Sequence, residues 1–356
     1  MVACAGEYGS SEPNTLVSAP TTTGPIEGLP TVGLEREHLQ AALDDAAELP
    51  RLRCLVIARH GEIQAEECFR GANPGSYANV KSVSKSVISA VVGIAIADGH
   101  LTGADQPIYP FLSEYLEGDT ASVKQRITVG NLLSMQSGLE RTSGNNYGRW
   151  VTSSNWVRYA ITRPMVAAPG STRLYSTGNS HLLSAILTEA TGRSTWDYAR
   201  EKLAEPLGMR LPRWPVDPQG VFFGGNDMLL TPRDMIRFGD LYRNRGRIGD
   251  RQVIPERWIE DSLAPRTRSR SGDEHYGYSW FIADVGGHPM FYAWGYGGQY
   301  IFVVPDLELT VATTSDPDDA RSRGHNQAII SILRNEIVPA AERGAHRAAP
   351  GATRVE

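Results

Sequence analysis

The chain has 356 residues, 41% of them hydrophobic, with 35 lysines and arginines against 40 aspartates and glutamates and a formal net charge of −5. This is ordinary globular composition, long enough for one large domain or two moderate ones. The net charge and the absence of a long basic run exclude nucleic acid and anionic lipid as first choices of partner. Lysine is rare, because only Lys81, Lys85, Lys124 and Lys202 occur and the other 31 basic residues are arginines. An amine can lose a proton where a guanidinium cannot, so each lysine is a candidate for chemistry.

The first residues leave two alternatives for the compartment. The chain begins Met-Val-Ala-Cys-Ala-Gly and continues in Ser, Thr, Pro and Gly to about Pro25. No charged segment precedes an apolar one, so the sequence as it stands carries no secretory signal, and the longest uncharged apolar stretch, residues 87–97, is too short to cross a bilayer. The small residues before Cys4 are similar to a bacterial lipoprotein junction whose signal has been trimmed. We expect either a lipid anchor at Cys4 on an exported, periplasmic protein or a cytoplasmic protein, with residues 1–26 a disordered leader in both cases.

The first predicted elements are a helix, a hairpin and a buried helix. Apolar residues at helical spacing predict a helix over residues 34–49, and strands are predicted at 53–59 and 63–69 around a turn at Gly61. Cys54 and Cys68 would face each other across this hairpin, which leaves both a disulfide and two free thiols open. Residues 82–98 then predict a helix that is apolar on every face and therefore buried on all sides.

The middle of the chain is predicted to be helical and its end to be a sheet. Helices are predicted at 129–135, 155–161, 178–190 and 195–203, and another starts at the capping box formed by Thr231 and Asp234. After Ser271 the period changes to two, which predicts strands at 276–283, 290–294, 299–304 and 308–314, followed by a helix over 326–341. The predicted fold class is α/β. One antiparallel sheet flanked by helices is formed from both chain ends (27–99 and 266–343), with a mainly helical inserted subdomain (100–265) and a disordered tail (344–356).

A hydroxyl and an amine lie together at the start of the buried helix. Ser82 and Lys85 are three residues apart and share a helix face, so the amine can reach the hydroxyl. Serine needs a base, and a buried lysine has a lowered pKa and can serve as one. Ser-x-x-Lys alone is a weak motif, but Tyr175 precedes another predicted helix, and the glycines of residues 295–298 allow backbone N–H groups to approach a substrate oxygen. The sequence has no CxxC or HExxH pattern, so no metal site is predicted.

Five segments in a fixed order resemble one family, the serine hydrolases related to class C β-lactamases and penicillin-binding proteins, with its esterases and 6-aminohexanoate-dimer hydrolases. They are residues 80–86 (VKSVSKS), 132–139 (LLSMQSGL), 175–179 (YSTGN), 205–209 (EPLGM) and 295–299 (GYGGQ). The resemblance implies a β-lactamase/transpeptidase-like fold without a cofactor, with Ser82 as nucleophile and Lys85 as general base. It implies Tyr175 as second base and as acid for the leaving group, and an oxyanion hole from the N–H groups of Ser82 and Tyr296.

Two departures from the family pattern bear on the substrate. Thr177 stands where the lactamases and peptidases have the asparagine of Tyr-x-Asn, and Ala293-Trp294-Gly295 stands where they have Lys-Thr-Gly. The partners for an acylamino group and for a carboxylate are thus missing, which argues against β-lactams and D-Ala-D-Ala peptides. Three further aromatic positions stay open: Trp294 and Tyr296 either pack the sheet edge or line the acyl pocket, and Tyr147 is either a loop anchor or a wall over the site.

The sequence therefore predicts a serine hydrolase that cleaves an ester or a small amide through an acyl-enzyme. Two alternatives remain. One is a D-amino-acid peptidase or weak β-lactamase, and the other is a catalytically inactive, penicillin-binding-like sensor.

Overall fold

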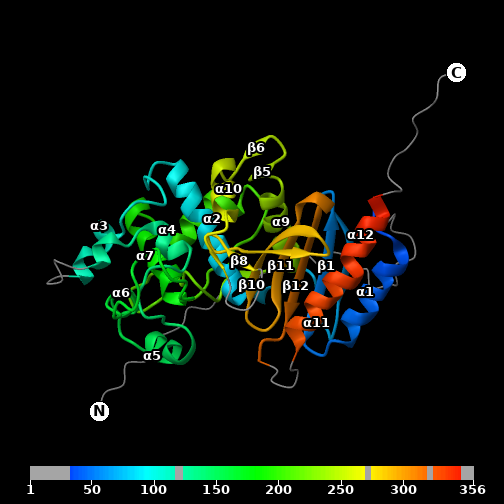
Figure 1. The fold of residues 1–356 in the computed structure, drawn as a ribbon, viewed down its shortest axis with the longest axis horizontal. Helices are drawn as coiled ribbons and strands as arrows, with labels where there is room; N and C mark the ends of the chain where they lie inside the picture. The colour runs from blue at the N-terminus through cyan, green and yellow to red at the C-terminus, as the bar shows by residue number, and fades with distance from the viewer. Residues whose placement is uncertain (1–32, 117–122, 269–273, 319–323, 346–356) are drawn as a thin grey trace, which may run out of the picture. The chain divides into compact units, whose positions relative to one another are not determined.

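An eight-stranded antiparallel sheet organises the computed structural model, which describes residues 33–116, 123–268, 274–318 and 324–345 (Figure 1). The strand order is β2-β1-β12-β11-β10-β9-β8-β7. The long strands are β1 (Leu52–Arg59), β2 (Glu62–Cys68), β9 (Phe281–Val285), β10 (His288–Gly295), β11 (Gln299–Val304) and β12 (Leu309–Ser315), and the edge is formed by β7 (Thr267–Arg268) and β8 (His275–Tyr276). Strand β1 pairs with β12, so Val56 lies opposite Ala312. The predicted α/β sheet built from both chain ends is confirmed.

Helices cover both faces of the sheet. On one face, Leu55, Phe302 and Val311 pack against α1 (Arg36–Glu48) and α11 (His325–Ile332), and α12 (Val338–Ala345) follows after a π-helical turn at Leu333–Ile337. On the other face lies α9 (Pro232–Arg243), which begins at the predicted capping box of Thr231 and Asp234. Gly239 lets α9 approach closely, because a β-carbon there would lie 2.7 Å from the Thr310 side chain. Helix α9 belongs to the segment that is predicted as a helical insertion (100–265), and yet it packs on the sheet. The subdomain boundaries remain a prediction.

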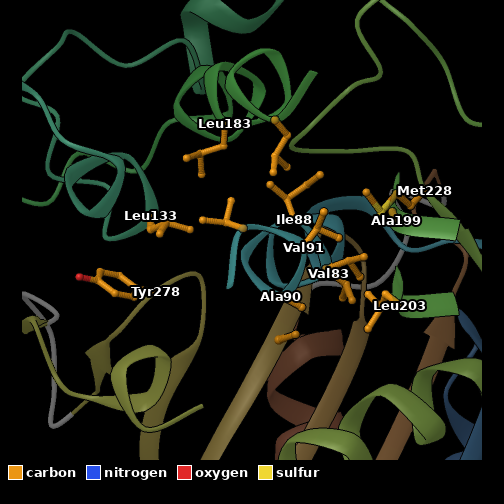
Figure 2. Close-up of a cluster of buried hydrophobic side chains, with 14 of the residues drawn as sticks. Val83, Ile88, Ala90, Val91, Leu133, Leu183, Ala199, Leu203, Met228 and Tyr278 are labelled. Atoms are coloured by element: carbon orange, nitrogen blue, oxygen red, sulfur yellow. The ribbon is translucent and has the colours of Figure 1, made fainter. Parts of the chain in front are cut away.

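Helix α2 (Ser84–Ala97) lies at the centre of the core, directly after a 3-10 turn at Lys81–Val83. Figure 2 shows its side chains Ile88 and Val91 surrounded by Leu133, Leu183 and Met228 from other elements. The helix is buried on every side from Ser84 to Ala95, as its composition predicts. Lys85 is the one charged side chain in this helix, and burial makes such a charge costly unless it is used.

Further helices, of which α7 is the longest, connect α2 to the sheet and complete the described parts of the middle region. They are α3 (Tyr109–Leu112), α4 (Val129–Leu133), α5 (Tyr147–Val151), α6 (Trp156–Ile161), α7 (Thr177–Thr191), α8 (Thr195–Ala199) and α10 (Glu256–Leu263). Two-residue strands β3 (Ala78–Asn79) and β4 (Leu229–Leu230) pair with each other, as do β5 (Arg247–Ile248) and β6 (Arg251–Gln252). Within the described ranges, no helix combines the length and apolar character needed to cross a bilayer.

The prediction of a single strand over residues 276–283 is wrong. The chain instead forms β8 and β9 with a turn between them, in which Gly277 N–H donates to the Trp280 carbonyl and Ser279 has a φ of 64°. The turn buries the Trp280 ring against Phe238 and Tyr242, so core packing overrides the period-two pattern. Helix α12 also runs to Ala345, two residues into the predicted tail. The predicted leader with Cys4, and residues 346–356, lie outside the described residues.

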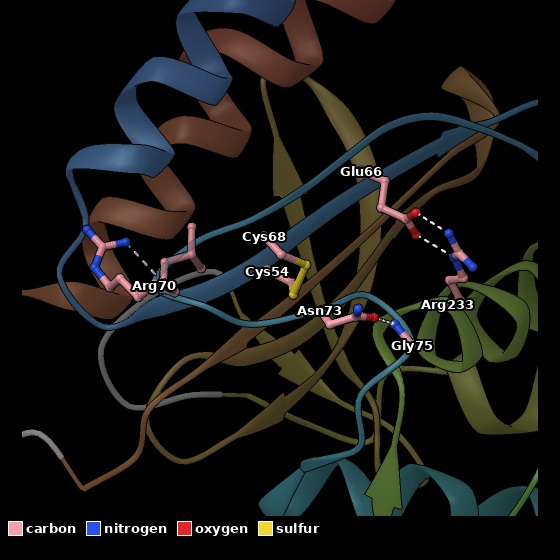
Figure 3. The surroundings of a disulfide bond; sticks show 8 residues. Cys54, Glu66, Cys68, Arg70, Asn73, Gly75 and Arg233 are labelled. Carbon is pink, nitrogen blue, oxygen red and sulfur yellow. Dashed lines mark hydrogen bonds and ion pairs between the residues drawn. A yellow bond between two sulfur atoms is a disulfide. The ribbon is translucent and has the colours of Figure 1, made fainter. Parts of the chain in front are cut away.

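A disulfide joins Cys54 and Cys68 across the β1–β2 hairpin (Figure 3). The two residues are direct cross-strand partners with a Cα–Cα distance of 4.1 Å. On β2, the strand that carries Cys68, the Glu66 carboxylate accepts two hydrogen bonds from the Arg233 guanidinium in the first turn of α9. The edge strand is therefore tied both to its neighbour and to the helix on the sheet face. Of the alternatives that the sequence leaves open, the structure has the disulfide.

Candidate active site

Ser82 and Lys85 meet at the start of α2. The 3-10 turn carries Ser82, and the Lys85 Nζ lies one turn later, 2.8 Å from Ser82 Oγ. The same amine donates a second hydrogen bond of 2.5 Å to the Gly225 carbonyl. The Lys85 side chain is only 1% exposed, so these two oxygens replace water around it. The predicted contact between hydroxyl and amine is present.

The surroundings of Lys85 decide how readily it loses its proton. Burial lowers the pKa of Lys85 to about 7, and the Asp227 carboxylate acts in the opposite direction. Asp227 itself accepts a 2.8 Å hydrogen bond from Asn79 Nδ2 and lies 3.7 Å from the Lys81 Nζ. The Asp227 carboxylate favours the ammonium form of Lys85. Because the Lys81 ammonium also lies close to this carboxylate, it offsets part of that effect. Near neutral pH, a large fraction of Lys85 is a free amine that can accept a proton.

Tyr175 lies across from this pair, directly before α7. Its ring centroid is 5.2 Å from Lys85 Nζ, and Ser82 lies close enough to its hydroxyl to affect the pKa of Tyr175. Burial raises the pKa of Tyr175 to about 12, while the nearby Ser82 hydroxyl and the charge of Arg173 oppose this shift. The phenol therefore carries its proton at neutral pH. The structure brings together the three residues that the sequence places in the catalytic centre.

A loop residue that sequence reasoning missed completes the hydrogen bonds of Ser82. Ser82 Oγ donates to Asn226 Oδ1 (3.3 Å), and Asn226 Nδ2 donates to Tyr147 Oη (3.1 Å). Tyr147 is thus part of the wall beside the serine. The signal in the sequence is the glycine pair ahead of Asn226, since a β-carbon on Gly225 would lie 2.6 Å from Thr177 Cγ2 and 3.4 Å from Lys85 Nζ. Only glycine at position 225 allows the backbone to approach the Lys85 amine this closely.

The glycine-rich end of β10 runs beside the turn that carries Ser82. A β-carbon on Gly295 would lie 2.2 Å from the Val80 carbonyl, so this close approach requires glycine. The Tyr296 side chain is 65% exposed, and Trp294 is partly buried with its ring edge toward Phe281. Trp294 thus packs against an aromatic side chain of the neighbouring strand β9.

Thr177 is buried in the wall of the site at the start of α7. Its Oγ1 lies 3.0 Å from Ser143 Oγ, and its backbone N–H also donates to that oxygen (2.9 Å). The threonine hydroxyl is therefore already paired within the protein.

An antiparallel sheet, a buried helix that starts with Ser-x-x-Lys and a tyrosine facing that serine define a serine hydrolase with the β-lactamase/transpeptidase fold. Residues 54–333 match the Beta-lactamase family. The chain belongs to this family.

Three similar proteins illustrate its range. The 6-aminohexanoate-dimer hydrolase of Paenarthrobacter ureafaciens is 24% identical over 273 residues, which cover 72% of this chain and 67% of that protein. The octameric penicillin-binding protein homologue from Pyrococcus abyssi has a TM-score of 0.68 at 20% identity, covering 86% of this chain and 78% of that one. A family VIII carboxylesterase has a TM-score of 0.67 at 16% identity, covering 88% and 99%. Both solved structures share the fold.

Proposed function

We propose that the protein hydrolyses esters or small uncharged amides through an acyl-enzyme on Ser82. The observation that carries the proposal is the buried Lys85 amine, 2.8 Å from Ser82 Oγ, with its pKa lowered to about 7 by burial. A buried amine near half-protonation at neutral pH is suited to general-base catalysis. The inactive-sensor alternative gives no reason to keep this costly group in the core.

The acylation step follows from these contacts. The neutral Lys85 amine takes the Ser82 proton while Oγ bonds to the carbonyl carbon of the substrate. The resulting oxyanion accepts hydrogen bonds from the backbone N–H groups of Ser82 and Tyr296. The tetrahedral intermediate then collapses and the bond to the alcohol or amine breaks. Tyr175, which is protonated at this pH, donates the proton that the leaving group needs, and the neighbouring Lys85 ammonium then returns a proton to Tyr175, so that both side chains end the step as they began.

Deacylation reverses the roles of serine and water. With the leaving group gone, a water molecule occupies its place and loses a proton to the neutral amine as its oxygen bonds to the acyl carbon. The second tetrahedral intermediate releases the carboxylic acid, and Ser82 Oγ regains its proton from Lys85. No other reactant is required, so the net reaction is hydrolysis.

The walls of the site favour uncharged substrates. Ala293 and Trp294 supply no cation at the end of β10, and the Thr177 hydroxyl is already paired with Ser143. Besides Lys85 and Tyr175, Ser82 is bordered by the neutral side chains of Asn226 and Tyr147. A substrate carboxylate would therefore lose water without gaining a charged partner. One of the similar proteins is named a carboxylesterase, which agrees with an ester as substrate.

A panel of p-nitrophenyl esters of increasing acyl length tests the proposal. We expect turnover by the wild type and a loss of about 10³-fold or more in Ser82→Ala, because the nucleophile is gone. Retained turnover in that variant would contradict the proposal. Nitrocefin and a D-Ala-D-Ala peptide test the peptidase and lactamase alternative, and acylation without turnover would instead support the sensor.

A further inference from the structure

A buried histidine–aspartate pair lies behind the loop that contacts Lys85 and Ser82. His181 Nε2 is 2.9 Å from Asp217 Oδ2, and both side chains are fully buried. The rings of Trp150, Trp156 and Phe223 surround the imidazole at centroid distances of 5.5–5.9 Å. The proposed mechanism makes no use of this pair, although it is the kind of polar group that a core excludes unless it has a task.

The loop at residues 222–226 runs along one face of α7 toward the catalytic centre. Near the far end of the contact, Ser184 Oγ donates to the Phe222 carbonyl (2.6 Å). Four residues earlier in the helix, the Ser180 carbonyl lies so close to the loop that a β-carbon on Gly224 would be 2.1 Å from it. The backbones of helix and loop are therefore in contact. At the start of the helix, Thr177 contacts Gly225, whose carbonyl accepts from Lys85. His181 is the residue on this face that hydrogen-bonds the loop next to Gly225.

The hydrogen bonds of His181 define its tautomer. The Gly224 N–H donates to His181 Nδ1 (3.5 Å), so Nδ1 carries no proton. The proton is then on Nε2, where it is donated to Asp217. Asp217 is held in turn, because its other oxygen accepts from the N–H groups of Gln219 (2.8 Å) and Val221 (2.9 Å). The aspartate thus selects the tautomer that can accept from Gly224.

We propose that His181 and Asp217 are positioning residues for the catalytic centre. By accepting the Gly224 N–H, His181 holds the next two residues in place, the Gly225 carbonyl against Lys85 Nζ and Asn226 against Ser82 Oγ. The pair acts through this loop and touches no reacting atom. The inference rests on the proposed function, because it assigns the pair to the reactivity of Ser82.

Two substitutions separate the two hydrogen bonds of the imidazole. Asparagine carries its amide oxygen at the place of Nδ1, so His181→Asn keeps an acceptor for Gly224 and loses the donor to Asp217. Glutamine carries its amide nitrogen near the place of Nε2, so His181→Gln keeps the donor to Asp217 and loses the acceptor for Gly224. Ser184→Ala is the matched control, because it removes the buried hydrogen bonds of Ser184 Oγ with the Phe222 carbonyl and the Thr195 hydroxyl at the other end of the same helix face.

The measurement is the rate of Ser82 labelling by a fluorophosphonate, with Tm recorded for each variant. We expect His181→Gln to slow labelling about tenfold or more, because small misplacements of a catalytic group are costly. His181→Asn should stay within about threefold of wild type although its Tm falls further, since Asp217 is left buried without a side-chain donor. Ser184→Ala should lower Tm and leave labelling unchanged. A labelling order that follows Tm would mean a purely structural role and would overturn the proposal.

A measurement on the wild type covers the case in which the variants do not fold. The ¹⁵N shifts of the His181 ring should show a neutral imidazole with its proton on Nε2 at the assay pH. A proton on Nδ1 would abolish the Gly224 contact and overturn the proposal regardless of the variants. If the wild type itself is not labelled at Ser82, the proposed function fails, which is a different result from failure of the positioning role.

Discussion

At the scale of single residues, the proposed mechanism gives Lys85 a role that arginine could not fill. The chain uses arginine for 31 of its 35 basic residues, yet keeps an amine in the core. The other lysines have different surroundings. Lys202 pairs with Asp98 (2.8 Å), and Lys81 lies near Asp227. Lys124 is buried within the 3-10 turn at Val123–Arg126. A guanidinium stays protonated at all relevant pH values, so it could not accept the Ser82 proton.

The pH dependence of kcat/KM tests this role. Because the pKa of Lys85 is lowered to about 7 and the base must be neutral, activity on a p-nitrophenyl ester should rise with pH with a midpoint near 7. Tyr175, with its pKa raised to about 12, should cause no alkaline loss below about pH 11. Asp227→Asn should move the midpoint to lower pH, since the carboxylate favours the ammonium. A midpoint unchanged in that variant would contradict this assignment of charges.

His325 predicts a pH dependence of stability. Burial lowers the pKa of His325 to about 4, and its Nε2 lies 2.9 Å from Ser315 Oγ at the base of the β10–β11 turn. Between pH 4 and 6.5 the unfolded chain binds more protons here than the folded one, so the free energy of unfolding falls as pH drops through this window. The loss between pH 7 and pH 4 is about 2–3 kcal/mol, and it is complete only below the folded-state pKa of about 4.

Urea unfolding at pH 7 and pH 4 measures this difference. The wild type should lose that amount in excess of His325→Asn, which has no titrating ring. Equal losses in the two proteins would show that His325 titrates normally in the folded state.

At the scale of elements, the disulfide stabilises the β1–β2 hairpin at the edge of the sheet. Cys54 and Cys68 close a loop with a sequence separation of 14. Such a link lowers the entropy of the unfolded chain and contributes about 3 kcal/mol in the chain-entropy description. We expect a variant with both cysteines changed to serine to lose about 2–3 kcal/mol of unfolding free energy in urea, and reduced wild type to match it. An intact mass with two free thiols in protein purified under oxidising conditions would contradict the link.

Elements set by local patterns are predictable from the sequence, and those set by distant packing are not. The capping box at Thr231 and the apolar helix after Ser82 are local signals, and both are confirmed. The strand predicted over 276–283 is wrong because the Trp280 ring turns into a core made by α9 and β10, which no local pattern records. Asn226 was missed for the same reason, since 144 residues separate it from the Ser82 that it contacts.

At the scale of the whole molecule, the fold explains how distant segments form one site. The pairing of β1 with β12 joins the strands from the two ends of the chain into one sheet, and β10 passes beside the turn that carries Ser82. Helix α7 starts two residues after Tyr175 and supports the loop at 224–226 from behind. The family order of motifs in the sequence predicts Ser82, Lys85 and Tyr175 as catalytic residues, whereas the contacts of Asn226 with Ser82 and Tyr147 appear only in the folded chain.

The central claim is that Ser82 becomes acylated, and mass spectrometry of the intact protein tests it most directly. After reaction with a fluorophosphonate or a slow ester, the wild type should gain the mass of one adduct, and peptide mapping should place it on Ser82. The Ser82→Ala variant should gain no mass under the same conditions. An adduct on another residue, or equal labelling of the variant, would contradict the account.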